Sequence, residues 1–343
     1  PSSTWGQFAG GRCMKLGTIN YHDKETIIAQ TDGGKIMKLA SAYSAANFDG
    51  TPNSMLALIK GGRKELSRAQ KAVQNVTSEA INPINEKDLD WLAPQPHPSK
   101  IFGVAFNNKR LMETAHRDPQ VPNFFLKPPS CLTGHLKPIE VRSFYGATIP
   151  ECELAAVIGR RAKNISAEKA LDYIFGYSIM NDVTSHQMKF SMDSVAVTRP
   201  KEIWAPYMSE WRHVHREDDR DLYFVYHSRS KGADTFGPCG PWITTADEVV
   251  DPNDLQVEAW IDGEQFADDH TSSYRFKIQE VIAEASRFFT LEPGDLFSFG
   301  TTAKGVGRFP HAHRNIDLSK MTGIIEIQIS GLGCLANPIS HIE

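Results

Sequence analysis

The alternation of apolar and polar positions divides the chain into two parts. In the first part, short strands are predicted over Lys15–Asn20 and Glu25–Leu39, and the second run turns as a hairpin at Asp32-Gly33-Gly34. Ser54–Asn75 carries apolar residues at helical spacing among Lys and Arg, which predicts one or two amphipathic helices. The pattern therefore predicts a small α+β domain over residues 1–95.

A proline-rich segment marks the expected domain boundary. Pro94–Ser99 contains three prolines in six residues and cannot continue a helix or a central strand. Beyond it the pattern is mostly strands, and helices are expected only at Ser166–Leu171 and Ile278–Phe289. The expected strands are Ile101–Phe106, Asn123–Leu126, Glu153–Ile158, Tyr173–Met180, Gln256–Ile261, Leu296–Phe299 and Gly323–Ile329. We predict an α+β protein that is mostly β, with a second domain over residues 100–343.

One stretch of this second domain breaks the strand pattern. Residues 199–229 are dense in charged and aromatic side chains and have weak periodicity. We interpret residues 185–230 as an excursion from the β-rich core. The sequence leaves three roles open for this excursion: a lid, a contact between subunits or a solvated loop.

Composition excludes several classes of protein. The 343 residues, at about 150 per domain, fit two domains, and 37 Lys+Arg against 41 Asp+Glu leave a net charge of −4, which argues against nucleic-acid binding. No apolar run approaches the length of a membrane span, and the N-terminus lacks the pattern of a secretory signal, so we expect a cytoplasmic protein. The five cysteines contain no C-x-x-C pair, and we expect free thiols.

Three acidic residues form the sharpest chemical feature. Glu151 and Glu153 lie two positions apart in a predicted strand, so their side chains share a face, and the following Leu154–Gly159 is apolar on both faces. Buried carboxylates on one face need a compensating charge, which favours a metal site. Asp182 follows another buried strand and can complete an all-oxygen site for a hard cation, or cap a turn.

Other candidate residues are weaker when each is taken alone. Lys231 can hold a carboxylate or enolate oxygen, although a surface lysine is the simpler interpretation. Gly300-Thr301 ends a strand, where backbone amides can bind an anion. The H-x-H pairs His213/His215 and His311/His313 lie in polar, irregular stretches and are interpreted as solvated loops. Nucleotide-binding glycine motifs and the G-x-S-x-G elbow of serine hydrolases are absent from the sequence.

Taken in order, these segments resemble the fumarylacetoacetate hydrolase family. The resemblance extends from about Ile101 to Pro338 and rests on five segments: FFLKPPSCLTGH (124–135), ECELAAVIG (151–159), ALDYIFGYSIMNDVT (170–184), KGADTFGPCGPW (231–242), and LEPGDLFSFGT followed by KGVG (291–307). It implies a mixed β-sandwich roll, usually in a homodimer. It also implies a small-molecule substrate, a 2-oxo or 1,3-diketo acid, whose enolate is stabilised by a chelating metal.

The resemblance implies a role for each candidate residue. Glu151, Glu153 and Asp182 are expected to bind Mg²⁺, or Mn²⁺ or Ca²⁺, and Lys231 is expected to contact the oxo-acid end of the substrate. Thr301 is expected to hydrogen-bond the substrate carboxylate. Further substrate contacts are expected from Gly300, Gln187, His186 and Phe106.

The sequence departs from the family pattern at two places. Lys109 stands where hydrolytic members carry a water-activating His, and Glu113 with His116 can form a displaced dyad if that segment is helical. His186 and Lys189 stand where the family usually has Arg and Gln. Substrate recognition is therefore expected to differ from that of the best-known members.

These departures leave three functions open. Hydrolytic cleavage of a carbon–carbon bond in an acylpyruvate-type substrate is the main expectation, because it is prevalent in the family. A lyase, such as a 2-oxo-3-deoxy sugar acid dehydratase, a decarboxylase or a hydratase, is the alternative, because the usual His is replaced by Lys109. The third hypothesis is that the protein binds a ligand without catalysis. The retained acidic residues, Lys231 and Thr301 argue against it.

Overall fold

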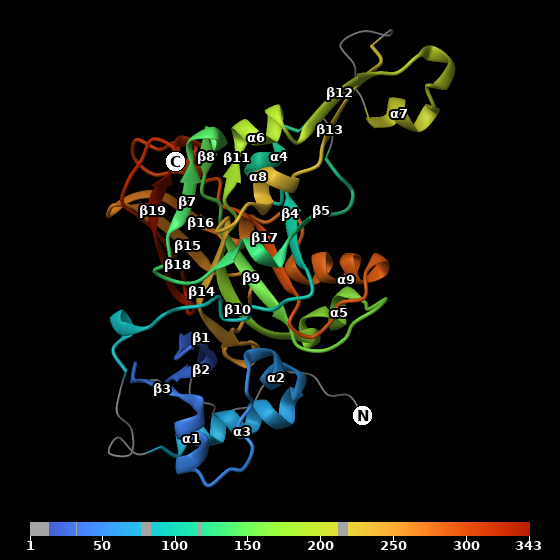
Figure 1. Cartoon of the computed structure of the whole chain (residues 1–343). Helices are drawn as coiled ribbons and strands as arrows, with labels where there is room; N and C mark the ends of the chain where they lie inside the picture. The colour runs from blue at the N-terminus through green and yellow to red at the C-terminus, as the bar shows by residue number, and fades with distance from the viewer. Residues whose placement is uncertain (1–13, 32, 77–83, 116–117, 212–218) are drawn as a thin grey trace.

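A computed structural model describes residues 14–31, 33–76, 84–115, 118–211 and 219–343. Within these ranges the protein is mostly β, as predicted, with two large sheets that pack face to face (Figure 1). The larger sheet has ten strands in the order β3-β2-β1-β14-β10-β9-β17-β4-β5, with β6 paired to β14, and the smaller has the order β16-β15-β18-β19-β7. Parallel pairs such as β17 with β4 occur among antiparallel ones, so both sheets are mixed.

The first predicted elements are present, and they join the main sheet. β1 (Lys15–Tyr21), β2 (Lys24–Gln30) and β3 (Ile36–Lys38) form antiparallel pairs, and Leu16 of β1 lies opposite Ile243 of β14 (Gly237–Thr245). α2 (Met55–Lys60) and α3 (Gly62–Gln74) occupy the stretch predicted as helical. The prediction of a strand through Leu39 was wrong, because Leu39 begins helix α1 (Leu39–Ala45). The three helices pack against one face of the large sheet.

Five neighbouring strands at one end of the large sheet carry the site. They are β9 (Cys152–Ile158), β10 (Ile174–Asn181), β17 (Leu296–Thr301), β4 (Ile101–Ala105) and β5 (Asn123–Lys127). Every residue of β9, β10, β14 and β17 is buried, because helices α1 to α3 cover one face and the second sheet covers the other. Continuous apolar sequence is the expected signature of such strands. The Gly- and Pro-rich segment 237–241, which is not among the predicted strands, begins the central strand β14.

The second sheet closes the core. It consists of β15 (Gln256–Ile261), β16 (Glu264–His270), β18 (Ile324–Ile329), β19 (Gly333–Ile342) and β7 (Ile139–Arg142). Alternate residues point into the core, as in β18, where Ile325, Ile327 and Ile329 are buried. α9 (Ile278–Phe288) and α5 (Ala167–Ala170) lie side by side at the edge of this core, and both were predicted.

The excursion over residues 185–230 contains regular elements. After β11 (Thr184–Ser185), which pairs with β8 (Thr148–Ile149), come α6 (His186–Ser191), β12 (Ser194–Thr198), α7 (Pro206–Trp211), β13 (Asp221–Val225) and α8 (Ser228–Gly232). β12 and β13 pair as a hairpin that projects from the body of the molecule (Figure 1). His213 and His215 lie outside the described residues.

Two short elements complete the fold: α4 (Lys109–Met112) and β6 (Leu132–Thr133). No helix within the described ranges is long and apolar enough to cross a membrane. Cys131, Cys152, Cys239 and Cys334 are free thiols, as predicted, and Cys13 lies outside the described residues.

Candidate active site

Antiparallel pairing of β9 and β10 brings the three acidic residues together. Asn181, the last residue of β10, lies opposite Cys152, the first residue of β9, so Asp182 comes next to Glu151 and Glu153. One carboxylate oxygen from each of the three side chains lies within 4.8 Å of the other two. The structure thus assembles the acidic cluster that the strand spacing predicts.

Glu153 is the most strongly perturbed member of this cluster. Its side chain is only 2% exposed, and Oε2 accepts hydrogen bonds from Ser298 Oγ at 2.6 Å and from Gly300 N at 2.9 Å. Burial, together with the negative charges of Asp182 and Glu151, raises the pKa of Glu153 to about 8. Without a bound cation, Glu153 therefore holds a proton at neutral pH.

Gly300 donates its backbone N–H to the carboxylate of Glu153. Its φ of +128° lies in a region that favours glycine, and a Cβ at this position would lie 2.9 Å from Asn107 Cβ. The backbone N–H of Gly300 is thus used by Glu153, and the expected contact of Gly300 with substrate stays a prediction.

Asp182 is held ionised by two buried lysines. Its Oδ1 accepts from Lys127 Nζ at 2.5 Å and its Oδ2 accepts from Lys231 Nζ at 2.5 Å. Burial alone would raise the pKa of Asp182, but the two ammonium groups outweigh burial and lower it. Lys231 also donates to Glu151 Oε2 at 3.1 Å and to Thr184 Oγ1 at 2.7 Å. Burial opposes its charge, yet the carboxylates of Asp182, Glu151 and Glu153 raise the pKa of Lys231, so it stays an ammonium.

Lys127 is a site residue that the sequence analysis missed. It ends β5 and is only 2% exposed, and its ammonium also donates to the carbonyl oxygens of Lys231 at 2.5 Å and Phe236 at 3.0 Å. A signal was present in the sequence, since Lys127 follows Phe-Phe-Leu at the end of a predicted strand and precedes two prolines. A lysine in that position is aligned with Phe125 on one face of the strand.

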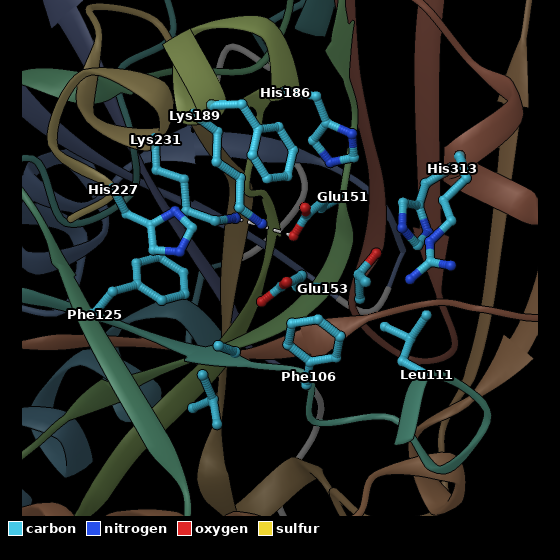
Figure 2. Close-up of a pocket in the computed structure, with 15 residues that line it drawn as sticks. Phe106, Leu111, Phe125, Glu151, Glu153, His186, Lys189, His227, Lys231 and His313 are labelled. Carbon is cyan, nitrogen blue, oxygen red and sulfur yellow. Dashed lines mark hydrogen bonds and ion pairs between the residues drawn. The ribbon is translucent and has the colours of Figure 1, made fainter. Parts of the chain in front are cut away.

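The acidic cluster opens into a cavity of about 270 Å³ (Figure 2). Glu151 and Glu153 point into its centre, and Phe106, Leu111 and Phe125 supply apolar wall. The remaining ionisable side chains that line it are all basic: His186, Lys189, His227, Lys231, His313 and Arg314. The cavity therefore combines a carboxylate centre with a basic surround, which suits a small anionic ligand bound beside a cation.

The structure brings some of the expected substrate contacts to this cavity and leaves others outside. Lys231, Thr301, His186 and Phe106 line it. Gln187 is exposed and packs over Gly146 instead.

The proposed catalytic segment after β4 also departs from expectation. Lys109 lies on the surface, where its ammonium donates to Ser272 O at 2.8 Å, and Glu113 is exposed. His116 lies outside the described residues. Leu111 is the residue of helix α4 that lines the cavity. Within the described residues, this segment thus contributes the apolar side chain of Leu111 to the cavity, whereas a water-activating dyad was expected there.

The interpretation of His311 and His313 as a solvated loop was half wrong. His311 is exposed, but His313 is buried and lines the cavity, with Nδ1 at 2.6 Å from Thr302 O. The turn over Ala312–Asn315 directs His313 inward. Burial lowers the pKa of His313 to about 4, so its imidazole is neutral. His227, whose pKa burial also lowers to about 4, and Lys189 are further lining residues that the site prediction omitted.

The acidic cluster fits a hard divalent cation. All three donors are carboxylates, which is the oxygen set preferred by Mg²⁺ and Mn²⁺. The two buried lysines compensate only two of the three carboxylates, and burial together with the remaining negative charge raises the pKa of Glu153. A bound cation would supply the missing positive charge.

We expect the affinity for a divalent cation to rise steeply with pH. The pKa of Glu153 is raised to about 8 in the metal-free protein, so below pH 8 a cation must displace its proton. The apparent association constant should increase about tenfold per pH unit up to pH 8 and level off above it. Calorimetry with Mn²⁺ between pH 6 and 9, in buffers of different ionisation enthalpy, measures both affinity and proton release. An affinity that stays constant from pH 6 to 8 would contradict the assignment of Glu153.

Comparison with known proteins agrees with this geometry. The model of the fumarylacetoacetate hydrolase C-terminal domain matches residues 100–340. A mitochondrial oxaloacetate tautomerase of Xenopus laevis is 28% identical over 309 residues, which cover 90% of this chain and 83% of the relative.

Solved structures of similar proteins also match most of the chain. The 5-carboxymethyl-2-hydroxymuconate delta-isomerase from Mycobacterium smegmatis shares 25% identity with a TM-score of 0.62, covering 96% of this chain and 99% of that one. The maleylpyruvate hydrolase from Sphingobium, in complex with manganese(II) and pyruvate, shares 25% identity with a TM-score of 0.66, covering 96% and 100%. Because the family model covers more than half of the sequence, the chain belongs to the fumarylacetoacetate hydrolase family of enzymes.

Proposed function

We propose that the protein catalyses keto–enol tautomerisation of a 2-oxo acid with the help of a divalent cation. The observation that carries this proposal is the cluster of Glu151, Glu153 and Asp182 beside the Lys231 ammonium, at the centre of a cavity lined by neutral imidazoles. The names of the oxaloacetate tautomerase and the delta-isomerase among its relatives support the same class of reaction.

The charged residues would bind and polarise the 2-oxo end. Glu151, Glu153 and Asp182 would hold a Mg²⁺ or Mn²⁺ ion, which supplies Lewis-acid polarisation of a 2-oxo group and its adjacent carboxylate. Lys231, fixed on Asp182 at 2.5 Å, places a permanent positive charge where an enolate oxygen gains negative charge. Thr301 lines the cavity, and its hydroxyl can donate to the carboxylate.

The proton transfer can be assigned to imidazoles. His186 and His227 line the cavity, and burial lowers the pKa of both, that of His227 to about 4. Both are therefore neutral at neutral pH and can accept a proton from the carbon next to the 2-oxo group. The same imidazolium then returns the proton to the enolate oxygen, which completes tautomerisation without water or a leaving group.

Hydrolysis of a carbon–carbon bond is the second candidate. It is supported by the maleylpyruvate hydrolase among the structural relatives. It requires a group that activates water, and the placement of Lys109, Glu113 and Leu111 does not supply one from the described residues. In this candidate, His116 or one of the neutral imidazoles that line the cavity would have to activate the water.

One experiment separates these reactions. The purified protein with Mg²⁺ is incubated in ²H₂O with oxaloacetate and with acylpyruvates, and products are analysed by NMR and mass spectrometry. We expect exchange of hydrogen for deuterium at the carbon next to the 2-oxo group, with no fragmentation.

Other outcomes would replace the proposal. Fragmentation with uptake of solvent ¹⁸O would establish a hydrolase. A loss of about 10² to 10⁴ in rate on His116→Ala would then identify His116 as the water-activating group. Loss of CO₂ or of water would establish a lyase. With a tautomerase, His116→Ala and Lys109→Ala should both exchange at close to the wild-type rate.

A further inference from the structure

Two cations of the cavity form no ion pair with the described residues, although Lys189 lies over the ring of Phe190. Of the three Lys and Arg side chains that line it, Lys231 is paired with carboxylates. Lys189 and Arg314 form no hydrogen bond or ion pair with any residue in the described part of the chain. Lys189 is half-buried and Arg314 is exposed, and the carboxylate of Glu151 is near enough to oppose the effect of burial on the pKa of Lys189. Cations that line a ligand cavity without forming an ion pair are suited to an anion of the ligand.

Lys189 is positioned by a firmly anchored helix. α6 follows directly after the acidic cluster, and its first amide, His186 N, donates to Ala147 O at 2.8 Å. Ser185 Oγ accepts from Met188 N at 3.0 Å, and Met188 is buried beneath the helix. His186 and Lys189 are one turn apart, so both side chains face the cavity, as Figure 2 shows.

Arg314 reaches the same cavity from a different element. It lies in the turn Ala312–Asn315, between buried His313 and Asn315, whose side chain accepts from His311 N at 2.7 Å. Arg314 and Lys189 are close enough that the charge of Arg314 contributes to lowering the pKa of Lys189, after burial. Two elements far apart in sequence thus converge on one region of positive charge.

The charge balance of the cavity indicates what this region binds. Lys127 and Lys231 compensate two of the three carboxylates, so a divalent cation at the cluster leaves one net positive charge there. Lys189 and Arg314 raise the net charge of the cavity to three positive charges. A monocarboxylic 2-oxo acid cancels only one of these charges. A dicarboxylic 2-oxo acid cancels two, and its enolate cancels all three.

We infer that Lys189 and Arg314 bind the second carboxylate of a dicarboxylic 2-oxo acid and make the enzyme selective for dicarboxylates. The inference rests on the proposed function for the reacting end of the substrate. The planar guanidinium of Arg314 can hold a carboxylate through two parallel hydrogen bonds, and the Lys189 ammonium adds a point charge. The cavity of about 270 Å³ is of the size that suits a small acid.

The test compares two substrates that differ only at the far end. Oxaloacetate carries a carboxylate where 2-oxobutyrate carries a methyl group, and exchange at the intervening carbon in ²H₂O reports turnover of both. We expect Lys189→Met and Arg314→Met each to lower kcat/KM for oxaloacetate about 10- to 100-fold, mainly through KM, with little change for 2-oxobutyrate. Lys189→Arg should restore most of the preference, and Lys169→Met, an exposed lysine on α5, should leave it unchanged.

A binding measurement keeps the inference separate from the proposed reaction. Malate and 2-hydroxybutyrate form the same matched pair without a 2-oxo group, and calorimetry on the Mg²⁺-loaded protein gives their affinities. We expect malate to bind more tightly, and the two Met variants to remove that difference. If the wild type exchanges neither 2-oxo acid but this pattern holds, the proposed reaction is wrong and the carboxylate site stands. If exchange occurs and the variants weaken both members of each pair equally, the dicarboxylate site is wrong.

Discussion

Replacing Glu153 with glutamine is expected to abolish both metal binding and activity. The substitution keeps the size of the side chain and removes one of three carboxylates from a cluster whose oxygens lie within 4.8 Å of one another. Since Lewis-acid polarisation is worth several kcal/mol of barrier, activity should fall by about 10³-fold or more. Titration calorimetry with Mn²⁺ should show no binding at the concentrations that saturate the wild type.

The stability of the same variant gives an independent readout. In the metal-free protein Glu153 is already protonated at neutral pH, because its pKa is raised to about 8, so a neutral amide should leave Tm nearly unchanged. Mn²⁺ should raise Tm of the wild type by mass action and leave that of the variant unaffected. Glu264→Gln, in an exposed pair with Arg308, is the control and should bind metal normally. Unchanged Mn²⁺ binding by Glu153→Gln would show that the cation lies elsewhere.

The acidic cluster could be predicted because its geometry is local. The two-residue period of the predicted strand placed Glu151 and Glu153 together, and in the structure Glu151 directly precedes β9 while Glu153 is its second residue. Asp182 follows directly after another apolar strand. Continuous apolar runs likewise predicted β9, β10 and β17. Only the pairing of β9 with β10 was needed to join the three acids, and adjacent strands in sequence often pair.

The basic surround of the cavity depends on contacts that no local pattern encodes. Lys189, His227 and Arg314 come from three segments that meet only in the folded chain. Lys109 shows the opposite case, since its position in the sequence suggests a catalytic cation, while its ammonium binds Ser272 O, 163 residues away. For Lys189 the helical spacing from His186 was the one local signal available.

One missed strand, β14, and one wrongly predicted element, at Leu39, also depend on contacts between distant residues. β14 contains glycine and proline, which usually mark turns, but its neighbours β1 and β10 supply pairing on both sides. Leu39 extends an apolar strand pattern, yet it begins α1, whose Leu39, Ala42 and Tyr43 are buried in the same core as α2 and α3. Packing against distant residues overrides local preference in both cases.

Lys127→Met is expected to cause the largest loss of stability of any single change at the site. Asp182 is fully buried, and the Lys127 ammonium supplies one of its two ion pairs, at 2.5 Å. Methionine fills the space but leaves Asp182 Oδ1 and the carbonyls of Lys231 and Phe236 without this donor. Breaking one side of a buried ion pair typically costs about 3–5 kcal/mol. Denaturant unfolding at pH 7 measures the loss. Lys320→Met, at an exposed lysine that pairs with half-buried Asp317, is the control and should cost under about 1 kcal/mol.

The dependence of this loss on pH identifies its origin. The two lysines lower the pKa of Asp182 below its usual 3.8, so its ion pairs stabilise the fold above pH 3.8, and that stabilisation is lost as the pH falls through the lowered pKa. The difference in unfolding free energy between wild type and Lys127→Met should therefore shrink as the pH falls towards the acid range. Adding Asp182→Asn to Lys127→Met should recover part of the loss, because the uncompensated charge is gone. A loss below about 1 kcal/mol at pH 7 would mean that Lys231 alone suffices to compensate Asp182.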